Sequence, residues 1–401
     1  MSTARLGEHA ALIRGITFKP ADKCDPQAMD AVVCMRTKNV QATLDESDLI
    51  AVPSSLVKNS AKMLSMGDIL VSSANSWNLV GKCCRVQELK YPSTAGAFIS
   101  ILRPTTEKLD SGYLYRWFSS DDVQRRVRSF GNQTTNISNL NHKRTLGLQM
   151  PLPPLAEQKR IAGILDAADA LRDKRRESLA QLDTLLQSTF LDMFGDPITN
   201  PMGWEVVPIT EAVAGKYGIK AGPFGSALKK QDYVSSGFRI YGQEQVIAGR
   251  FDVGDYYIDD RKFMKLQNCA VAAGDILVSL VGSYGRVLVV PEGIEPGIIN
   301  PRLLKISPRQ ELVTSLYLAT LIQNEATQRK LENMSHGGTM GILNVGLLKQ
   351  LTIPTPPIDL QHRFAAIVES IEHQKASQSA HLDELDTLFD SLQSRAFRGD
   401  L

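Results

Sequence analysis

The sequence lacks the motifs that mark the common nucleotide- and metal-dependent enzymes. No GxxxxGK[ST] phosphate-binding loop occurs, because Gly81-Lys82-Cys83 and Gly215-Lys216-Tyr217 both depart from it. Asn200-Pro201-Met202 and Asn300-Pro301-Arg302 come nearest to the Asn-Pro-Pro-aromatic motif of adenine methyltransferases, and neither fits. HExxH is absent, and the 6 histidines lack ligand spacing. These absences exclude a P-loop motor and give no sign of a methyltransferase or a zinc hydrolase.

Cysteine and excess charge of one sign are also scarce. The 5 cysteines form no CxxC pair, so we expect reduced, mostly buried thiols and no metal site. Lys and Arg number 45 against 43 Asp and Glu, and the net charge of +2 leaves any nucleic-acid face to local clusters. The most apolar run, residues 287–299, is broken by two prolines and two glutamates, and the first residues lack a signal segment. We therefore expect a soluble, cytoplasmic protein.

What the sequence does contain is a long internal repeat. Residues 66–72 (MGDILVS) return as residues 273–279 (AGDILVS), 207 positions later. Pro153-Pro154 returns as Pro356-Pro357 after 203 positions, and the Leu-Asp-Thr-Leu string at 182–185 recurs at the same offset. Because the order is kept and the offset barely drifts, the chain is a tandem duplication of one globular unit and one long helix.

The globular units have the pattern of small, strand-rich domains. Short apolar segments such as 68–72, 98–102 and 275–281 are bounded by turn residues, which predicts strands. One helix is expected late in each unit, over residues 113–129 and 311–334, where apolar residues recur every three or four positions. With 401 residues and 43% apolar content, the chain can fill at least two cores.

A proline pair and then a long helical pattern follow each unit. We predict helices over about 156–193 and 359–395, each roughly 55 Å long at ~1.5 Å per residue. Both are apolar at the ends and polar in the middle, which favours an antiparallel pair, although a helical hairpin that only fills space between domains fits the pattern too. The predicted fold class is α+β, with two β-rich domains separated by two long antiparallel helices as a pseudo-twofold internal duplication. The predicted parts are residues 1–150, 151–196, 197–353 and 354–401.

Several strings resemble the specificity subunits of type I restriction-modification systems. Residues 151–161 (PLPPLAEQKRI), followed by a helix that ends in Phe194-Gly195-Asp196, are similar to the central spacer helix of that family. Residues 222–229 (GPFGSALK) resemble a loop of its target recognition domains, and residues 395–401 resemble its usual end. The distal copy departs at Leu360, where a glutamate is usual. The resemblance covers essentially the whole chain, and the order of the motifs makes it specific.

The resemblance implies a DNA reader without catalysis of its own. Two target recognition domains each read one half of a split, asymmetric DNA site, and the paired helices fix the gap between the halves. The helices also dock two modification subunits, which use S-adenosylmethionine to methylate adenine N6, and restriction subunits that use ATP and Mg complete the assembly. No cofactor is expected on this chain.

The candidate contact residues are polar or basic side chains on expected loops, because base edges and phosphates are read by such groups. For each of them a solvated loop side chain is the alternative. The DNA candidates are Arg36, Lys38, Asn39, Asn75, Asn78, Lys82, Gln133, Thr134, Lys220, Ser226, Lys229, Lys230, Gln243, Arg261, Lys262, Tyr284, Arg286, His336 and Thr339. On the long helices, the candidates for partner binding are Arg172, Arg175, Arg176, His373 and Lys375.

Three other functions remain open from the residues alone. A stand-alone DNA-binding protein would share the fold without needing partner surfaces on the helices. A scaffold held together by a coiled coil would show no salt-dependent DNA affinity. An enzyme with an unrecognised site is the third. None of them explains the duplication, the helix positions and the missing catalytic motifs together.

Overall fold

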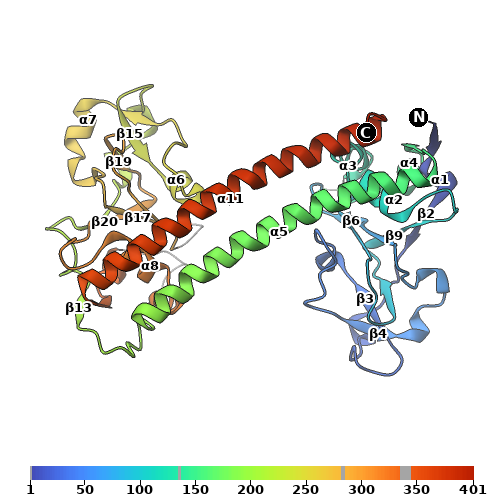
Figure 1. The fold of residues 1–401 in the computed structure, drawn as a ribbon, viewed down its shortest axis with the longest axis horizontal. Helices are drawn as coiled ribbons and strands as arrows, with labels where there is room; N and C mark the ends of the chain where they lie inside the picture. The colour runs from blue at the N-terminus through green and yellow to red at the C-terminus, as the bar shows by residue number, and fades with distance from the viewer. Residues whose placement is uncertain (1, 134–136, 281–284, 335–344) are drawn as a thin grey trace. The chain divides into compact units, whose positions relative to one another are not determined.

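A computed structural model describes residues 2–133, 137–280, 285–334 and 345–401 (Figure 1). Contacts divide the chain into two compact units: unit 1 comprises residues 1–176 and 380–401, and unit 2 comprises residues 177–379. Both contain helices and sheets, which confirms the α+β class. The four-part division of the sequence stays a prediction.

The two units repeat one strand topology. Unit 1 has a four-stranded antiparallel sheet in the order β2-β9-β5-β7, and unit 2 has β14-β20-β17-β18. A three-stranded sheet follows in each, β4-β3-β8 and β16-β15-β19, whose central strand has one antiparallel and one parallel neighbour. Each unit also has a two-stranded pair, β1-β12 or β13-β21, and unit 1 has in addition the three-stranded sheet β10-β11-β6. The repeat in sequence is therefore a repeat of fold.

The bounds of the elements follow the chain. In unit 1 they are β1 (Thr3–Arg5), α1 (Leu6–His9), β2 (Ala10–Arg14), β3 (Ala31–Met35), β4 (Ala51–Pro53), β5 (Ile69–Ser72), β6 (Ala74–Asn75), β7 (Cys83–Arg85), β8 (Ser93–Ala95), β9 (Ile99–Pro104), α2 (Ser111–Phe118), α3 (Asp121–Ser129), β10 (Asn132–Gln133), β11 (Ser138–Asn139), α4 (His142–Leu146) and β12 (Gln149–Pro151). In unit 2 they are β13 (Val206–Pro208), β14 (Ile219–Ala221), β15 (Phe238–Tyr241), α6 (Gln243–Ala248), β16 (Tyr257–Ile258), α7 (Asp260–Lys265), β17 (Ile276–Ser279), β18 (Val287–Val289), β19 (Gly297–Ile299), β20 (Leu303–Ile306), α8 (Ser315–Gln323), α9 (Glu325–Met334), α10 (Val345–Leu348) and β21 (Thr352–Pro354).

The repeated GDILVS string is a strand buried on both faces. Along β5, Ile69 belongs to one hydrophobic cluster and Leu70 to another, since successive side chains point to opposite faces of the sheet. Residues Ile276 and Leu277 of β17 alternate in the same way. The glycine that begins each string has a positive φ, 88° for Gly67 and 80° for Gly274, a conformation that strongly favours glycine. This environment explains why the string reads as a continuous apolar run.

The prediction of one late helix in each unit is wrong, because the structure has two shorter helices there. Helices α2 and α3 replace it in unit 1, and α8 and α9 replace it in unit 2. Ser120 and Asn324 adopt extended conformations at the breaks, with ψ of 146° and 135°. Four residues later a glutamine side chain, Gln124 or Gln328, donates a hydrogen bond to a carbonyl at the end of the preceding helix. Both capping residues are common helix starts that the apolar periodicity does not reveal.

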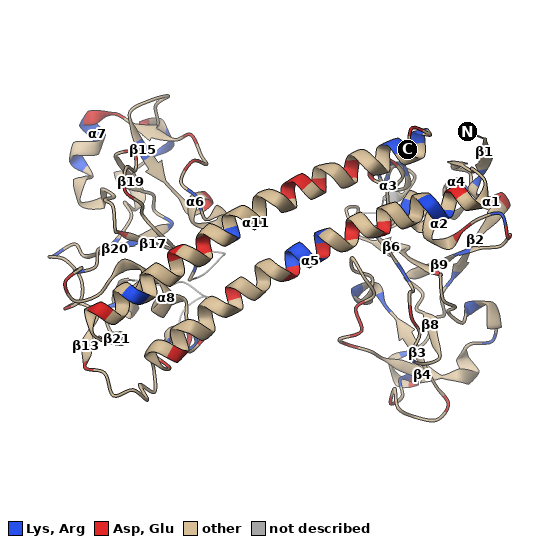
Figure 2. Cartoon of the chain, viewed as in Figure 1, with Lys and Arg blue, Asp and Glu red and all other residues tan. Residues whose placement is uncertain are grey.

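The two long helices are α5 (Leu155–Phe194) and α11 (Ile358–Arg398), 40 and 41 residues long. They match the expected ranges to within a few residues. Each belongs partly to unit 1 and partly to unit 2, because the division falls after Arg176 in α5 and after Ser379 in α11. Charged residues recur along both helices (Figure 2), as expected for helices with one exposed side.

A buried glutamine holds the start of each long helix. The side chains of Gln158 and Gln361 are fully buried, and each amide makes three hydrogen bonds to backbone groups. The partners, at 2.8 to 3.0 Å, are Asp110, Lys108 and Pro153 for Gln158, and Thr314, Leu312 and Pro356 for Gln361. The repeated Pro-Pro motif and its glutamine are therefore a device that ties each helix to the loop before α2 or α8.

Candidate nucleic-acid interface

The first candidate loop of unit 1 follows β3 and is held by its own polar groups. Asn39 is fully buried: its Oδ1 accepts from the Arg36 amide at 2.8 Å, and its Nδ2 donates to the carbonyls of Asp45 and Asp48 at 2.8 and 3.1 Å. Arg36 and Lys38 both pair with the Asp48 carboxylate, and the hydrogen bond from Lys38 lowers the pKa of that carboxyl. Asn39 thus shapes the loop, whereas Arg36 and Lys38 reach its surface with their charge partly balanced.

The second candidate loop of unit 1 lies between β5 and β7. Asn75 is half-buried in β6, while Asn78 and the neighbouring Trp77 are exposed. Lys82 donates from its Nζ to the side-chain oxygen of Gln41 at 2.6 Å, which brings this loop against the first one. The two loops therefore present one polar surface of unit 1, with a tryptophan ring on it.

Five predicted residues lie in or next to segments outside the described ranges. Gln133 lies in β10, whose backbone pairs with β11. Four other candidates, Thr134, Tyr284, His336 and Thr339, lie outside the described residues.

In unit 2 the glycine-containing loop after β14 holds exposed candidates. Ser226 lies in the short helix η5 (Gly225–Ala227), and Lys230 opens η6 (Lys230–Asp232) next to Lys229. The Asp232 carboxylate accepts from the Lys229 amide at 2.7 Å and pairs with Lys262 of α7 at 2.9 Å. Lys262 is thus compensated within the unit, while Ser226, Lys229 and Lys230 are exposed.

Three further candidates of unit 2 differ in exposure. Gln243 is buried at the start of α6, and its side-chain amide donates to Ser279 Oγ at 2.7 Å, so it joins α6 to β17 inside the unit. Arg286 is exposed and donates to the Ile247 carbonyl at 3.3 Å. Arg261 is exposed on α7.

A basic hollow in unit 2 includes one predicted residue and three that the sequence did not single out. Lys220 of β14 lines it together with Lys216, Lys265 and Lys349. These lysines come from separate segments of the chain, so no local charge run marks them. Only the fold brings them together.

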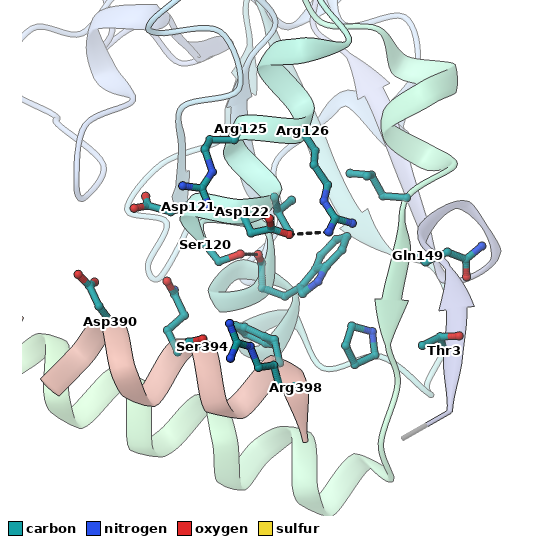
Figure 3. Close-up of a pocket in the computed structure, with 16 residues that line it drawn as sticks. Thr3, Ser120, Asp121, Asp122, Arg125, Arg126, Gln149, Asp390, Ser394 and Arg398 are labelled. Atoms are coloured by element: carbon teal, nitrogen blue, oxygen red, sulfur yellow. Dashed lines mark hydrogen bonds and ion pairs between the residues drawn. The ribbon is translucent and has the colours of Figure 1, made fainter. Parts of the chain in front are cut away.

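A hollow of unit 1, with a volume of about 570 Å³, lies between α3, the β1-β12 pair and the last turns of α11 (Figure 3). Charged side chains of both signs line it. Asp122 pairs with Arg126 at 2.9 Å, and Arg398 and Asp390 lie on the α11 side. Because both signs are present, this hollow does not favour a polyanion over other ligands.

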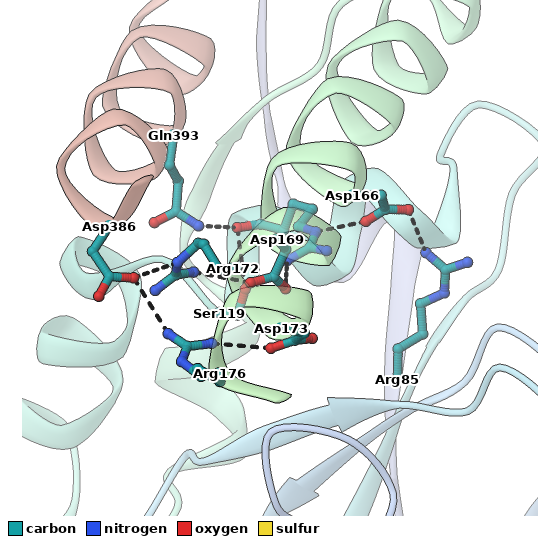
Figure 4. Close-up of polar contacts among 10 residues, drawn as sticks. Arg85, Ser119, Asp166, Asp169, Arg172, Asp173, Arg176, Asp386 and Gln393 are labelled. Carbon is teal, nitrogen blue, oxygen red and sulfur yellow. Dashed lines mark hydrogen bonds and ion pairs between the residues drawn. The ribbon is translucent and has the colours of Figure 1, made fainter. Parts of the chain in front are cut away.

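Three of the five predicted partner-binding residues, Arg172, Arg176 and Lys375, form ion pairs between the two long helices. In unit 1, Arg172 of α5 pairs with Asp386 of α11 at 2.5 Å (Figure 4). In unit 2, Lys375 of α11 pairs with Asp183 of α5 at 2.8 Å. Lys375 lies 203 positions after Arg172, and Asp183 lies 203 positions before Asp386. The same cross-helix ion pair therefore occurs once in each unit. It holds the helices antiparallel in both.

The other candidates on the long helices have fewer contacts within the protein or keep more of their surface exposed. Arg176 pairs with Asp173 at 3.0 Å and with Asp386 at 3.3 Å, but its side chain stays about half exposed. Arg175 is half-buried and His373 is exposed. Of the five, His373 and Arg176 are the most accessible to another chain.

The junction between α2 and α5 in unit 1 carries a buried ionic network. Arg116 is only 7% exposed and donates to Asp166 at 2.6 Å and to Asp169 at 2.7 Å. Arg85 lies 3.6 Å from Asp166, and Arg172 reaches Asp169 at 2.9 Å. Arg172 extends the network to Asp386 of α11. In unit 1, one network of ion pairs therefore joins the domain to both long helices.

The described ranges contain neither a cluster of metal ligands nor a helix that could span a membrane. Within them, no group of three or more His, Cys, Asp or Glu side chains could hold a metal ion. No helix in the same ranges is long and apolar enough to cross a membrane.

Comparisons with known proteins agree on one kind of relative. A family profile described as "Type I restriction modification DNA specificity domain" matches residues 2–182 and 225–386. The chain is 27% identical to the type I restriction enzyme StySPI specificity subunit of Salmonella potsdam, over all of this chain and 89% of that protein. It is 25% identical to the EcoKI specificity subunit of Escherichia coli K12, over 97% of this chain and 87% of that protein.

Solved structures share the fold at low sequence identity. A chain from a structure described as the basis of complex assembly and conformational transition of the type I R-M system matches with a TM-score of 0.57 and 16% identity, covering 100% of this chain and 98% of its own. The type I restriction-modification S subunit from M. genitalium matches with a TM-score of 0.55 and 16% identity, covering 99% and 96%. At this identity the match concerns fold alone.

Proposed function

Because the chain belongs to the type I restriction-modification DNA specificity family, we propose that it reads a DNA site in two separate halves, one with each unit. Its membership makes it a specificity subunit that recognises DNA sequence and is not itself the catalyst. The observation that carries the two-half proposal is the repeat of one strand topology in both units with different loops on it. Two domains that share a strand framework but carry different loops suit two half-sites of different sequence.

The paired helices are proposed to fix the gap between the half-sites. A helix of 40 residues is about 60 Å long at ~1.5 Å per residue. Since one turn of B-DNA spans roughly 34 Å, helices of this length can separate two readers by a turn or more. Support comes from the cross-helix ion pair that each unit contains.

Other chains are proposed to do the chemistry. Two modification subunits would bind S-adenosylmethionine and methylate adenine N6, and restriction subunits would use ATP and Mg. We propose that the modification subunits dock on α5 and α11 at Arg172, Arg175, Arg176, His373 and Lys375. Arg176 and His373 support this best, because they keep exposed surface in the helix pair.

One experiment tests these statements together. The chain is co-expressed with its modification subunit, and the host DNA is sequenced by a single-molecule method that detects methylated adenine. A split motif, two short specified halves around a fixed gap, is the expected result. If the two proteins co-purify and bind S-adenosylmethionine but no split motif appears, the two-half proposal is wrong. A continuous motif would contradict the gap and leave DNA reading intact.

A further inference from the structure

Unit 2 contains a hollow whose lining is basic and aromatic. It has a volume of about 570 Å³ and lies between β14, the loop that follows it, the short helix η7 (Gln267–Cys269) and α10. Among the described residues β14 is the edge strand of its sheet, and the hollow lies beside it. Ile219, Leu266 and Cys269 are buried and form apolar parts of the wall.

The charge of this hollow is uncompensated. The lining has four lysines, Lys216, Lys220, Lys265 and Lys349, and no Asp or Glu among its described residues. Within the described ranges none of the four forms an ion pair, although other lysines of unit 2, such as Lys262, do. In a chain with a net charge of only +2, four unpaired cations around one concave site create a local positive potential that attracts an anion.

Two aromatic rings accompany the lysines. Tyr217 is 47% exposed and Phe224 is 62% exposed. The Nζ atoms of Lys216 and Lys220 lie 5.7 and 5.6 Å from the centroid of the Tyr217 ring. Amines beside exposed rings are the combination by which proteins hold a nucleic-acid backbone together with its sugars or bases.

The loop that carries Phe224 is fixed against the sheet. The Gly222 amide donates to the Leu303 carbonyl at 3.0 Å. A Cβ on Gly222 would lie 1.9 Å from the Asn300 carbonyl oxygen, so no other residue fits there without moving the backbone. The wall of the hollow is therefore formed before any ligand arrives.

Two of the four lysines have no lysine or arginine counterpart at the same position of unit 1. Strand β2 pairs with β9 as β14 pairs with β20, and Leu12 holds the position of Ile219 when the two GDILVS strands are superposed in register. His9, Ala10 and Ile13 then stand where unit 2 has Lys216, Tyr217 and Lys220. Lys216 and Lys220 are thus specific to the second unit, whereas Lys58 stands at the position of Lys265 in the same register.

We propose that this hollow is a phosphate anchor for duplex DNA, which binds the backbone without regard to sequence. The inference rests on the proposed DNA-reading function and adds an asymmetry to it, because Lys216 and Lys220 of the anchor occur in unit 2 alone. Contacts to phosphates raise affinity for every sequence alike and leave the choice of bases to other loops.

The test uses the full chain and a short duplex of random sequence. Lys216, Lys220, Lys265 and Lys349 are replaced together by Gln, and affinity is measured over a range of salt concentrations. Each lost phosphate contact lowers the slope of log affinity against log salt by about 0.9, so a drop of about 3 to 4 is expected. The matched control replaces Arg250, Arg309, Arg329 and Lys330 of the same unit by Gln, which removes the same charge elsewhere. An equal drop in both variants, or no drop in the first, overturns the anchor.

A second measurement on the unchanged chain does not depend on how the variant folds. Lysines are acetylated with and without the duplex and identified by mass spectrometry. Protection of Lys216, Lys220, Lys265 and Lys349, with Lys330 still reactive, is the expected result, and equal reactivity of all five overturns the anchor. If the unchanged chain binds no DNA at all, the proposed function itself fails; salt-dependent binding that leaves these lysines unprotected removes only the anchor. The methylated motif of the co-expressed complex should stay the same in the Gln variant, and an altered motif would make the hollow a base reader.

Discussion

A single buried amide holds the first turn of each long helix, and its removal has a predictable effect. Replacing Gln158 by Ala leaves two carbonyls and one amide without partners in a buried site. Unsatisfied buried groups cost about 1 to 3 kcal/mol each, so a loss of about 3 kcal/mol in unfolding free energy is expected after partial relaxation. Urea unfolding followed by circular dichroism measures it. Lys159→Ala, an exposed neighbour, should change little, and equal effects of both would contradict the role of Gln158.

His142 gives unit 1 a dependence on pH. Its Nε2 lies 3.0 Å from the Oγ of the buried Ser100, and burial, followed by the charge of Arg14, lowers the pKa of this histidine. Since the folded-state pKa is depressed, the unfolded chain binds a proton first as pH falls. Stability is therefore full above the ordinary value of about 6.5 and declines as pH drops below it towards the folded-state pKa. Thermal melts across this range should show a smaller decline in His142→Gln, and an identical decline would remove His142 as the cause.

Residue type alone did not distinguish side chains that could contact DNA at the surface from side chains that the fold buries. Asn39 and Gln243 had the right chemistry for bases, yet the fold buries both and uses their amides to hold a loop and a helix. Lys216, Lys265 and Lys349 were missed for the opposite reason, since their common hollow exists only after folding. A sequence identifies which side chains can bind DNA, but burial decides which ones face it.

At the scale of elements, the network around Arg116 distinguishes unit 1 from unit 2. The equivalent position in unit 2 is Thr320, because Tyr113 and Tyr317 donate alike to Pro151 and Pro354. Arg116→Met removes a buried cation that bridges two carboxylates and leaves Asp166 only its longer contact with Arg85 and Asp169 its pair with Arg172, so a loss of about 1.5 to 3 kcal/mol is expected. Hydrogen exchange should accelerate in α2, whereas α8 of unit 2 keeps its rate.

A matched control for Arg116 lies on the neighbouring helix. Arg126 of α3 pairs with Asp122 at 2.9 Å, but both side chains are more than half exposed. Arg126→Met should therefore change stability by less than about 1 kcal/mol. Equal losses in the two variants would mean that the buried network adds nothing beyond a surface ion pair.

The long helices were predictable from the sequence, but the breaks between the shorter helices were not. The long helices followed from their apolar spacing and the proline pairs before them, since a pattern over some forty residues outweighs local exceptions. The breaks at Ser120 and Asn324 were missed, because apolar periodicity continues through them while the backbone turns extended. The available signals were Ser120 and Asn324, which are common helix starts, and the glutamine four residues after each of them.

At the scale of the whole molecule, the duplication was readable because its shared parts are structural. The GDILVS strands, the proline pairs and the two buried glutamines all serve the framework, and each occurs once per unit. The loops that would read DNA differ between the units, and no pattern of residues predicts which bases they select. Sequence therefore predicts the framework well and the recognised site not at all.

The proposed ruler can be lengthened without disturbing either cross-helix ion pair. Seven residues of high helix propensity are inserted both after Arg176 in α5 and after Ser379 in α11, where the contacts divide into units. The Arg172–Asp386 and Lys375–Asp183 pairs then stay within their own units. Seven residues add about 10.5 Å, and they are close to two full turns, so the helix faces keep their phase.

Because B-DNA rises roughly 3.4 Å per base pair, the gap of the methylated motif should lengthen by up to about three base pairs, with both half-sites unchanged. Single-molecule sequencing of DNA from cells that co-express the variant and the modification subunit measures the gap directly. Insertion into α5 alone is the control, because it slides the two helices out of register and should abolish methylation. An unchanged gap in the double insertion would show that the helices hold the units without setting their spacing on DNA.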